Sequence, residues 1–123
     1  MSVDLKARAA QAVELAQKPN VVLILADDLG YSDLGYYAGE IRTPHIDRLA
    51  AQGLLFQRAY CQQAVCAPSR ASVLTGRRPD FLRIWDLKTK IRDEHPDIQT
   101  LPQWLKDRGY VTAGVGKVFD PRS

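Results

Sequence analysis

The clearest hydrophobic pattern in the chain is an unbroken apolar run at residues 21–26, Val-Val-Leu-Ile-Leu-Ala. A continuous run that is rich in β-branched side chains predicts a strand buried on both faces, as in a parallel sheet. Shorter apolar runs at residues 54–56 and 110–115 predict two further strands. The hydrophobic pattern therefore predicts a sheet that includes these segments.

Helical patterns separate the predicted strands. Thr43 and Pro44 suit the first positions of a helix, and Gly53 is placed to end it. A second helix is expected to begin at Thr100 and to end at Gly109. Strands that alternate with helices predict an α/β layered fold, in which ligands gather at the carboxyl ends of the strands.

The first residues differ in composition from the rest of the chain. Residues 3–17 are rich in alanine with interspersed charge, which predicts a helix with a weak apolar face. Pro19 breaks this pattern before the first predicted strand. We therefore divide the chain into a helical extension, residues 1–17, and one domain, residues 18–123, whose size suits a single core.

The composition excludes several classes of protein. Hydrophobic residues make up 46% and charged residues 25% of the 123 residues, which is typical of a soluble globular protein. The formal net charge is +3, but the lysines and arginines are scattered and accompany no motif that reads nucleic acid. No apolar run approaches the ~18 residues of a membrane span. We therefore expect neither nucleic acid nor a membrane as a partner.

The N-terminal residues and the number of cysteines indicate the cellular compartment in which the protein is expected. The first residues lack the apolar centre of a secretory signal, so the chain as written is expected in the cytoplasm. A true start further upstream would instead make it periplasmic or secreted. Cys61 and Cys66 are too few to form a disulfide framework or, by themselves, a structural zinc site.

Adjacent carboxylates, Asp27 and Asp28, follow the first predicted strand directly. Carboxylates this close repel each other, and a hard cation such as calcium removes that repulsion. Calcium takes ~6–8 oxygen ligands, so other segments would have to complete the shell. The alternative is a solvated pair of loop aspartates, or Asp28 as the cap of a turn.

A reactive position is expected at Cys66. Pro68 favours the start of a helix and Gly76 favours its end, which puts Cys66 just before a helix N-terminus. Free backbone N–H groups there stabilise negative charge, and Arg70 adds a permanent cation one turn later. A thiolate, an alkoxide or a bound anion would each be stabilised. The alternative is a buried structural cysteine.

The pattern C-x-P-S-R-x-x-x-L-T-G-R that begins at Cys66 resembles the signature of the sulfatase family. Residues 27–30 resemble the first metal-binding segment of that family, and residues 109–117 resemble the strand that carries its sulfate-binding lysine. Residues 43–50 resemble the intervening helix, with His45 where asparagine is more usual. The matching signature residues are Cys66, Pro68, Ser69, Arg70, Leu74, Thr75, Gly76 and Arg77.

The resemblance covers about residues 18–119 and implies a specific fold. Sulfatases have the layered α/β/α fold with a mostly parallel sheet that is also found in alkaline phosphatase, and this chain would be its N-terminal portion. Within the family the chain is most similar to the iduronate 2-sulfatase type, on residues 62–65, 76–80 and 115–119. That type has histidine at the position of Asp120. The replacement by aspartate would remove a hydrogen-bond donor from the sulfate pocket and place a negative charge near the bound anion.

The resemblance also implies a mechanism for hydrolysing sulfate esters. A formylglycine-generating enzyme would convert Cys66 to formylglycine, whose hydrate attacks sulfur. Calcium would bind to Asp27, Asp28 and the modified Cys66. Lys117 would neutralise charge around sulfur, and Arg70 would do the same or hold the formylglycine hydroxyl. The substrate would be a sulfated small molecule or a sulfated sugar.

Part of the family's site has no match in this sequence. The remaining calcium ligands, and the histidine and lysine that serve the leaving group, come from later parts of a sulfatase. We therefore expect the chain alone to be inactive. The alternatives are a phosphonate or phosphate ester hydrolase of the same superfamily, and a truncated remnant without turnover.

Several other residues are expected to have structural roles. Cys61, Trp85 and Trp104 are expected to pack in the core. His45 is expected to be structural or on the surface, and His95 to lie in a solvated loop.

Overall fold

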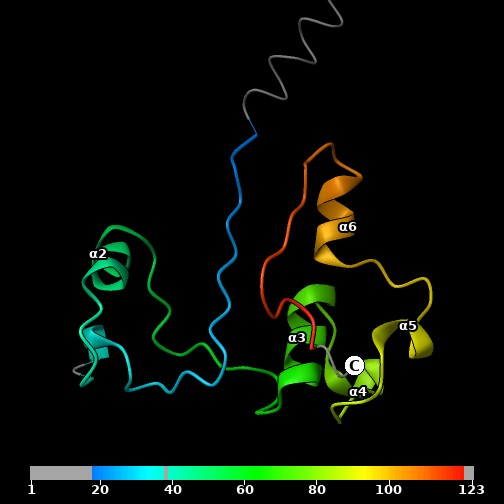
Figure 1. Cartoon of the computed structure of the whole chain (residues 1–123), viewed down its shortest axis with the longest axis horizontal. Helices are drawn as coiled ribbons and strands as arrows, with labels where there is room; N and C mark the ends of the chain where they lie inside the picture. The colour runs from blue at the N-terminus through cyan, green and yellow to red at the C-terminus, as the bar shows by residue number, and fades with distance from the viewer. Residues whose placement is uncertain (1–17, 38, 121–123) are drawn as a thin grey trace, which may run out of the picture.

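The structure, a computed structural model, describes residues 18–37 and 39–120 (Figure 1). The predicted helical extension, residues 1–17, lies outside the described residues. Helices and turns joined by extended segments make up the described part of the chain. The helical elements are η1 (Gly35–Tyr37), α2 (Pro44–Gln52), α3 (Cys66–Thr75), α4 (Pro79–Leu82), α5 (Ile91–Glu94) and α6 (Leu101–Lys106).

Helix α2 begins at Pro44 and ends before Gly53, as the sequence predicts. Thr43 does not cap the helix backbone with its side chain; its hydroxyl donates to Asp47 Oδ1 at 2.8 Å and accepts from the Gly35 N–H at 2.9 Å. Asp47 Oδ1 also accepts the Tyr36 N–H at 3.0 Å. These contacts attach η1 to α2.

Helix α6 begins after Thr100, whose backbone N–H donates to Gln103 Oε1 at 3.0 Å in a capping box. The helix ends earlier than predicted, at Lys106. The following residues form turns, in which Gly109 adopts a φ of 82° and the Tyr110 N–H returns to the Leu105 carbonyl at 3.2 Å. A left-handed residue ends the helical direction here, and glycine adopts it without steric cost.

The core of the described residues lies where α3 packs against α4. Ala71 of α3, Leu82 of α4 and Ile84 form one buried cluster, and Ile91 and Ile98 pack against it. Helix α3 is therefore the most buried element, and Gly76 ends it with a φ of 67°. In the described part of the chain, no helix has the length and apolar character that crossing a bilayer requires.

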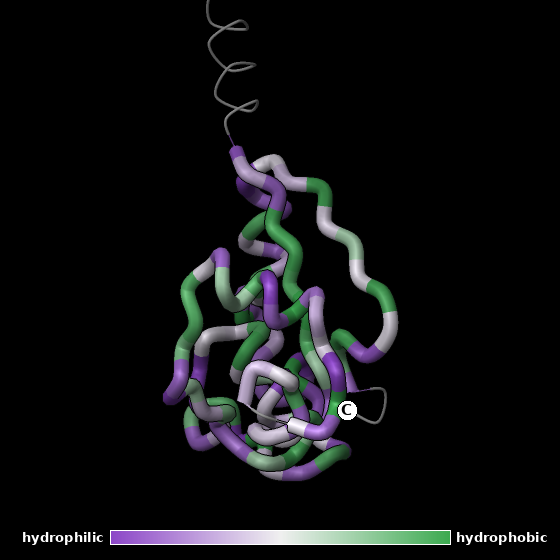
Figure 2. Tube along the Cα trace, turned by 90° about the vertical axis from the view of Figure 1, so that its left-hand side faces the viewer, coloured by the Kyte–Doolittle hydropathy of each residue, from purple (hydrophilic) through white to green (hydrophobic). Residues whose placement is uncertain are grey.

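The predicted strands at residues 21–26, 54–56 and 110–115 are wrong as hydrogen-bonded elements, because no described residue belongs to a strand. The expected burial on both faces is also absent: Ile24 is 82% exposed and Val111 is 98% exposed. Apolar residues are thus spread along extended parts of the chain as well as in helices (Figure 2).

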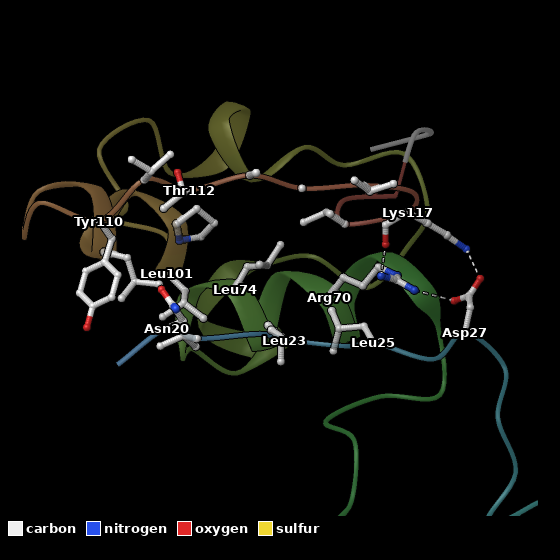
Figure 3. Close-up of a pocket in the computed structure, with 18 residues that line it drawn as sticks. Asn20, Leu23, Leu25, Asp27, Arg70, Leu74, Leu101, Tyr110, Thr112 and Lys117 are labelled. Atoms are coloured by element: carbon white, nitrogen blue, oxygen red, sulfur yellow. Dashed lines mark hydrogen bonds and ion pairs between the residues drawn. The ribbon is translucent and has the colours of Figure 1, made fainter. Parts of the chain in front are cut away.

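The two longer segments nevertheless run in the same direction, with α3 and α6 beside them (Figures 1 and 3). They line opposite sides of a cavity of about 460 Å³, to which alternate residues Val21, Leu23 and Leu25 contribute from the first segment. Neighbouring strands of a sheet lie ~4.8 Å apart and share backbone hydrogen bonds. Here a cavity separates the two segments, so a ladder would need another extended segment between them.

Candidate functional site

The site is built where three segments from distant parts of the sequence meet. Asp27 ends the first extended segment, Arg70 projects from α3, and Lys117 ends the second extended segment (Figure 3). Arg70 Nη2 donates to Asp27 Oδ1 at 3.0 Å, and Lys117 Nζ donates to Asp27 Oδ2 at 2.7 Å. One carboxylate therefore accepts from two cations, one on each of its oxygens.

Arg70 holds the two extended segments together at this end. Its side chain is 8% exposed, and its second guanidinium nitrogen, Nη1, donates to the Lys117 backbone carbonyl. A planar guanidinium can reach two acceptors in fixed directions, which a lysine ammonium on a flexible stem does less well. Arg70 therefore fixes both the Asp27 carboxylate and the backbone of Lys117.

A group of potential metal ligands lies beside this ion pair. Asp27, Asp28 and Cys66 each offer one ligand atom, and these atoms lie within 4.8 Å of one another. Asp28 has a φ of 54°, a left-handed conformation that aspartate tolerates better than most residues. Cys66 is the first residue of α3, where the helix N-terminus favours negative charge. Two carboxylates at this spacing suit a hard divalent cation.

The ion pairs set the charge states of Asp27 and Lys117. Hydrogen bonds from Lys117 and then from Arg70 hold the pKa of the Asp27 carboxyl below its usual range. Hydrogen bonds with Asp27 and then with Cys66 raise the pKa of Lys117 above its usual value. Asp27 is therefore an anion and Lys117 a cation at neutral pH.

A second cavity, of about 500 Å³, opens over these groups. The residues that line it include Asp27, Asp28, Cys66, Ser69, Arg70, Gln63 and Cys61. All the residues for which the sequence predicts a role in metal binding or catalysis lie at or beside this cavity, since Lys117 is bonded to Asp27. Cys61 was expected in the core, but it is exposed on the wall of the cavity.

The structure adds the burial of Asp120 to what the sequence predicts for this residue. The sequence predicts a like charge near a bound anion. In the structure the Asp120 side chain is 0% exposed, and its Oδ2 lies 3.4 Å from Lys117 Nζ. The spacing of three residues between an acid and a lysine on one turn was the available signal, but only the fold shows that the carboxylate is buried.

The aromatic and histidine residues depart from their predicted roles. Trp85 is 52% and Trp104 is 42% exposed, so neither is core packing. Trp85 Nε1 donates to Asp80 Oδ1 at 3.1 Å. His95 is half-buried rather than solvated, because its ring stacks on Phe81 and its Nε2 lies 3.1 Å from the Leu82 carbonyl. His45 is exposed, as predicted.

The ion pairs of Asp27 predict a dependence of stability on acid. Because the pKa of Asp27 is lowered in the folded state, its contribution is present above its unfolded pKa of ~3.9 and is lost as the pH falls through the folded value. Asp27→Asn should therefore lower the melting temperature at about pH 6, and the difference from the unchanged chain should shrink at about pH 3. Thermal unfolding at both pH values measures it.

Asp97→Asn is the matched control, since Asp97 is exposed and lies between α5 and α6. It removes the same charge without touching the ion pairs. A melting difference for Asp27→Asn that is the same at both pH values would contradict an electrostatic contribution from Asp27.

Comparison with known proteins gives a consistent result. The model of the family described as "Sulfatase" matches residues 19–119. Iduronate 2-sulfatase of Homo sapiens is 52% identical over 112 residues, which cover 90% of this chain and 20% of that protein. The Mus musculus protein of the same name is 50% identical over 114 residues, which cover 92% and 20%. N-acetylgalactosamine-6-sulfatase of Homo sapiens is 43% identical over 112 residues, which cover 82% and 22%.

The chain spans about a fifth of the length of the curated relatives it matches. The matched residues include every predicted site residue from Asp27 to Lys117. The similarity to the iduronate 2-sulfatase type that the sequence predicts is thus confirmed. The family match covers most of the chain, and the chain belongs to the sulfatase family.

Proposed function

We propose that this chain supplies part of a site that hydrolyses sulfate esters through a formylglycine formed from Cys66. The observation that carries the proposal is the convergence of Asp27, Asp28 and Cys66, whose ligand atoms lie within 4.8 Å of one another beside two cations. Carboxylates can bind a metal, and the formylglycine formed from Cys66 can attack sulfur. The cations can hold the negatively charged sulfate group.

Formylglycine would stand at the start of α3, where Cys66 lies. When formed, it supplies a hydroxyl for attack at sulfur and a second hydroxyl whose deprotonation later releases sulfate. The helix N-terminus at Cys66 favours the negative charge that develops on the attacking oxygen. Conversion requires a formylglycine-generating enzyme, which is the protein partner we propose.

Asp27 and Asp28 would hold calcium. When bound, calcium polarises a sulfate oxygen and lowers the pKa of the attacking hydroxyl. Calcium takes ~6–8 oxygen ligands, and the described residues supply a minority of them. The residues present fit the ion but do not complete its shell, so we propose that the chain by itself has no turnover.

Lys117 and Arg70 would have different roles. Both terminal nitrogens of Arg70 are bonded to the protein, to Asp27 and to the Lys117 carbonyl, which supports a positioning role. The Lys117 side chain is 29% exposed and reaches the site with its ammonium. We therefore assign the neutralisation of sulfate charge to Lys117 and the alignment of the two segments to Arg70.

We propose the fold and the substrate class of the sulfatase family for this chain. We propose that the layered α/β/α fold forms when further strands are present; the parallel course of the two extended segments over α3 and α6 supports this (Figure 3). Relatives named iduronate 2-sulfatase and N-acetylgalactosamine-6-sulfatase support a sulfated sugar as substrate. These names favour sulfate over phosphate or phosphonate esters.

Metal binding tests the proposal in the chain itself. Terbium takes the same oxygen ligands as calcium and its bound form luminesces, so calcium affinity is measured by displacement of terbium. We expect a calcium dissociation constant of about millimolar, typical of an incomplete site. Asp27→Asn and Asp28→Asn should each abolish this binding, and Asp97→Asn should leave it unchanged. Binding that survives both site substitutions would overturn the assignment of the metal to Asp27 and Asp28.

A further inference from the structure

Asp120 has a place in the site that the proposed roles do not explain. It is a buried acid, with a side chain that is 0% exposed, and its Oδ2 lies 3.4 Å from Lys117 Nζ. The same ammonium lies 2.7 Å from Asp27 Oδ2. Lys117 thus lies between two carboxylates, one of which is a proposed metal ligand.

Metal binding at Asp27 disturbs this arrangement. Both oxygens of the Asp27 carboxylate already accept from cations, Arg70 on Oδ1 and Lys117 on Oδ2. A divalent cation that takes either oxygen competes with these contacts, and it repels an ammonium held next to it. Arg70 is fixed by its second bond to the Lys117 carbonyl, so Lys117 is the cation that can move.

The backbone at Lys117 is held in place. Arg70 binds the Lys117 carbonyl, and the Val118 N–H closes a tight turn on the Gly116 carbonyl at 3.0 Å. Rotation of the lysine side chain alone would therefore transfer the ammonium from Asp27 to Asp120. Asp120 is not a member of the group of ligand atoms formed by Asp27, Asp28 and Cys66.

We propose that Asp120 is a positioning residue that takes over the Lys117 ammonium when a divalent cation binds Asp27. This inference rests on the proposed function. The contact with Asp120 would keep Lys117 charged and at the edge of the cavity while Asp27 binds the metal. It also gives the acid that replaces the usual histidine of this type a role within the site, because a carboxylate paired with Lys117 does not act as a free like charge against sulfate.

Metal affinity in a double-mutant cycle tests the proposal. Asp120→Asn removes the acceptor charge with little change of shape, so Lys117 stays on Asp27 and competes with the ion. We expect terbium to bind about three- to tenfold more weakly to Asp120→Asn than to the unchanged chain. In a Lys117→Met background there is no ammonium to relocate, and Asp120→Asn should change the affinity less than about twofold.

The cycle distinguishes this inference from its alternatives. Equal weakening in both backgrounds would show that Asp120 acts directly on the ion, and no weakening in either would show that it has no part in metal binding; both overturn the proposal. Terbium binding that is insensitive to Asp27→Asn would overturn the proposed metal site itself. Binding that depends on Asp27 but not on Asp120 would overturn only the role of Asp120.

A measurement on the unchanged chain covers the case in which Asp120→Asn does not fold. Amine acylation followed by peptide mass spectrometry compares the reactivity of Lys117 with that of exposed Lys88, with and without saturating terbium. If Asp120 receives the ammonium, Lys117 should stay less reactive than Lys88 after the ion binds. A rise of Lys117 reactivity to the level of Lys88 would overturn the proposal.

Discussion

Replacing Cys66 with alanine is expected to lower sulfate-ester hydrolysis by at least about 10⁴-fold in a sulfatase that contains this chain. The reason is that alanine cannot become formylglycine, so the site loses the proposed nucleophile while Asp27, Asp28 and Lys117 remain. Removal of a covalent nucleophile costs far more than removal of one stabilising contact. Turnover of an aryl sulfate in the presence of calcium measures the loss.

Cys61→Ala is the matched control for this prediction. Cys61 also lines the cavity over the site but lies outside the signature, so its loss should leave most of the activity. Terbium binding should persist in Cys66→Ala, because Asp27 and Asp28 are unchanged. An active Cys66→Ala enzyme would refute the role of Cys66, whereas equal losses from both cysteine variants would point to a packing effect instead.

Replacing Arg70 with methionine should have the largest effect on the geometry of the site. Methionine keeps much of the buried volume but loses the bonds to Asp27 Oδ1 and to the Lys117 carbonyl. Loss of a charged partner from this half-buried ion pair should lower the free energy of unfolding by about 1–3 kcal/mol. Terbium binding should weaken by about tenfold or more, since Asp27 is no longer aligned.

Arg70→Lys should restore little of either quantity, because one ammonium cannot reach two acceptors that lie on different segments. Arg58→Met is the control, since Arg58 is exposed and its loss removes one positive charge. Thermal unfolding and terbium titration of the three variants measure both effects. Full recovery in Arg70→Lys would show that charge alone, and not the forked geometry, holds the two segments.

The sequence predicts the site more fully than the fold. Cys66, Arg70 and Gly76 lie in one short motif, so a single helix positions them regardless of what surrounds it. Asp27 and Lys117 end apolar runs, and the structure brings their charged groups to 2.7 Å. The motif predicts these positions because a helix satisfies its own backbone hydrogen bonds and so can be recognised from local sequence.

The strands could not be predicted in the same way. A helix satisfies its own backbone hydrogen bonds, but a strand needs a partner at ~4.8 Å. Residues 21–26 and 110–115 have the composition and direction of parallel strands, yet within the described residues no third extended segment lies between them. The hydrophobic pattern of each segment shows that it can form a strand. Whether it pairs depends on neighbouring strands, which the pattern of the segment itself does not describe.

Residues outside the motifs were the least predictable. Residue type alone predicts that Cys61 and Trp85 lie in the core, but both are exposed, because the core between α3 and α4 is small. One difference from the family predicts that Asp120 lies near the anion. Its complete burial and its contact with Lys117 depend on tertiary packing, which no local pattern specifies.

Peptide mass spectrometry tests whether Cys66 is the precursor of formylglycine. The chain is produced together with a formylglycine-generating enzyme, beside a known sulfatase that reports whether conversion is working. We expect the peptide that contains Cys66 to carry an aldehyde in place of the thiol, and the peptide that contains Cys61 to keep its thiol. An unmodified Cys66 alongside a fully converted control sulfatase would show that Cys66 is not the precursor of formylglycine.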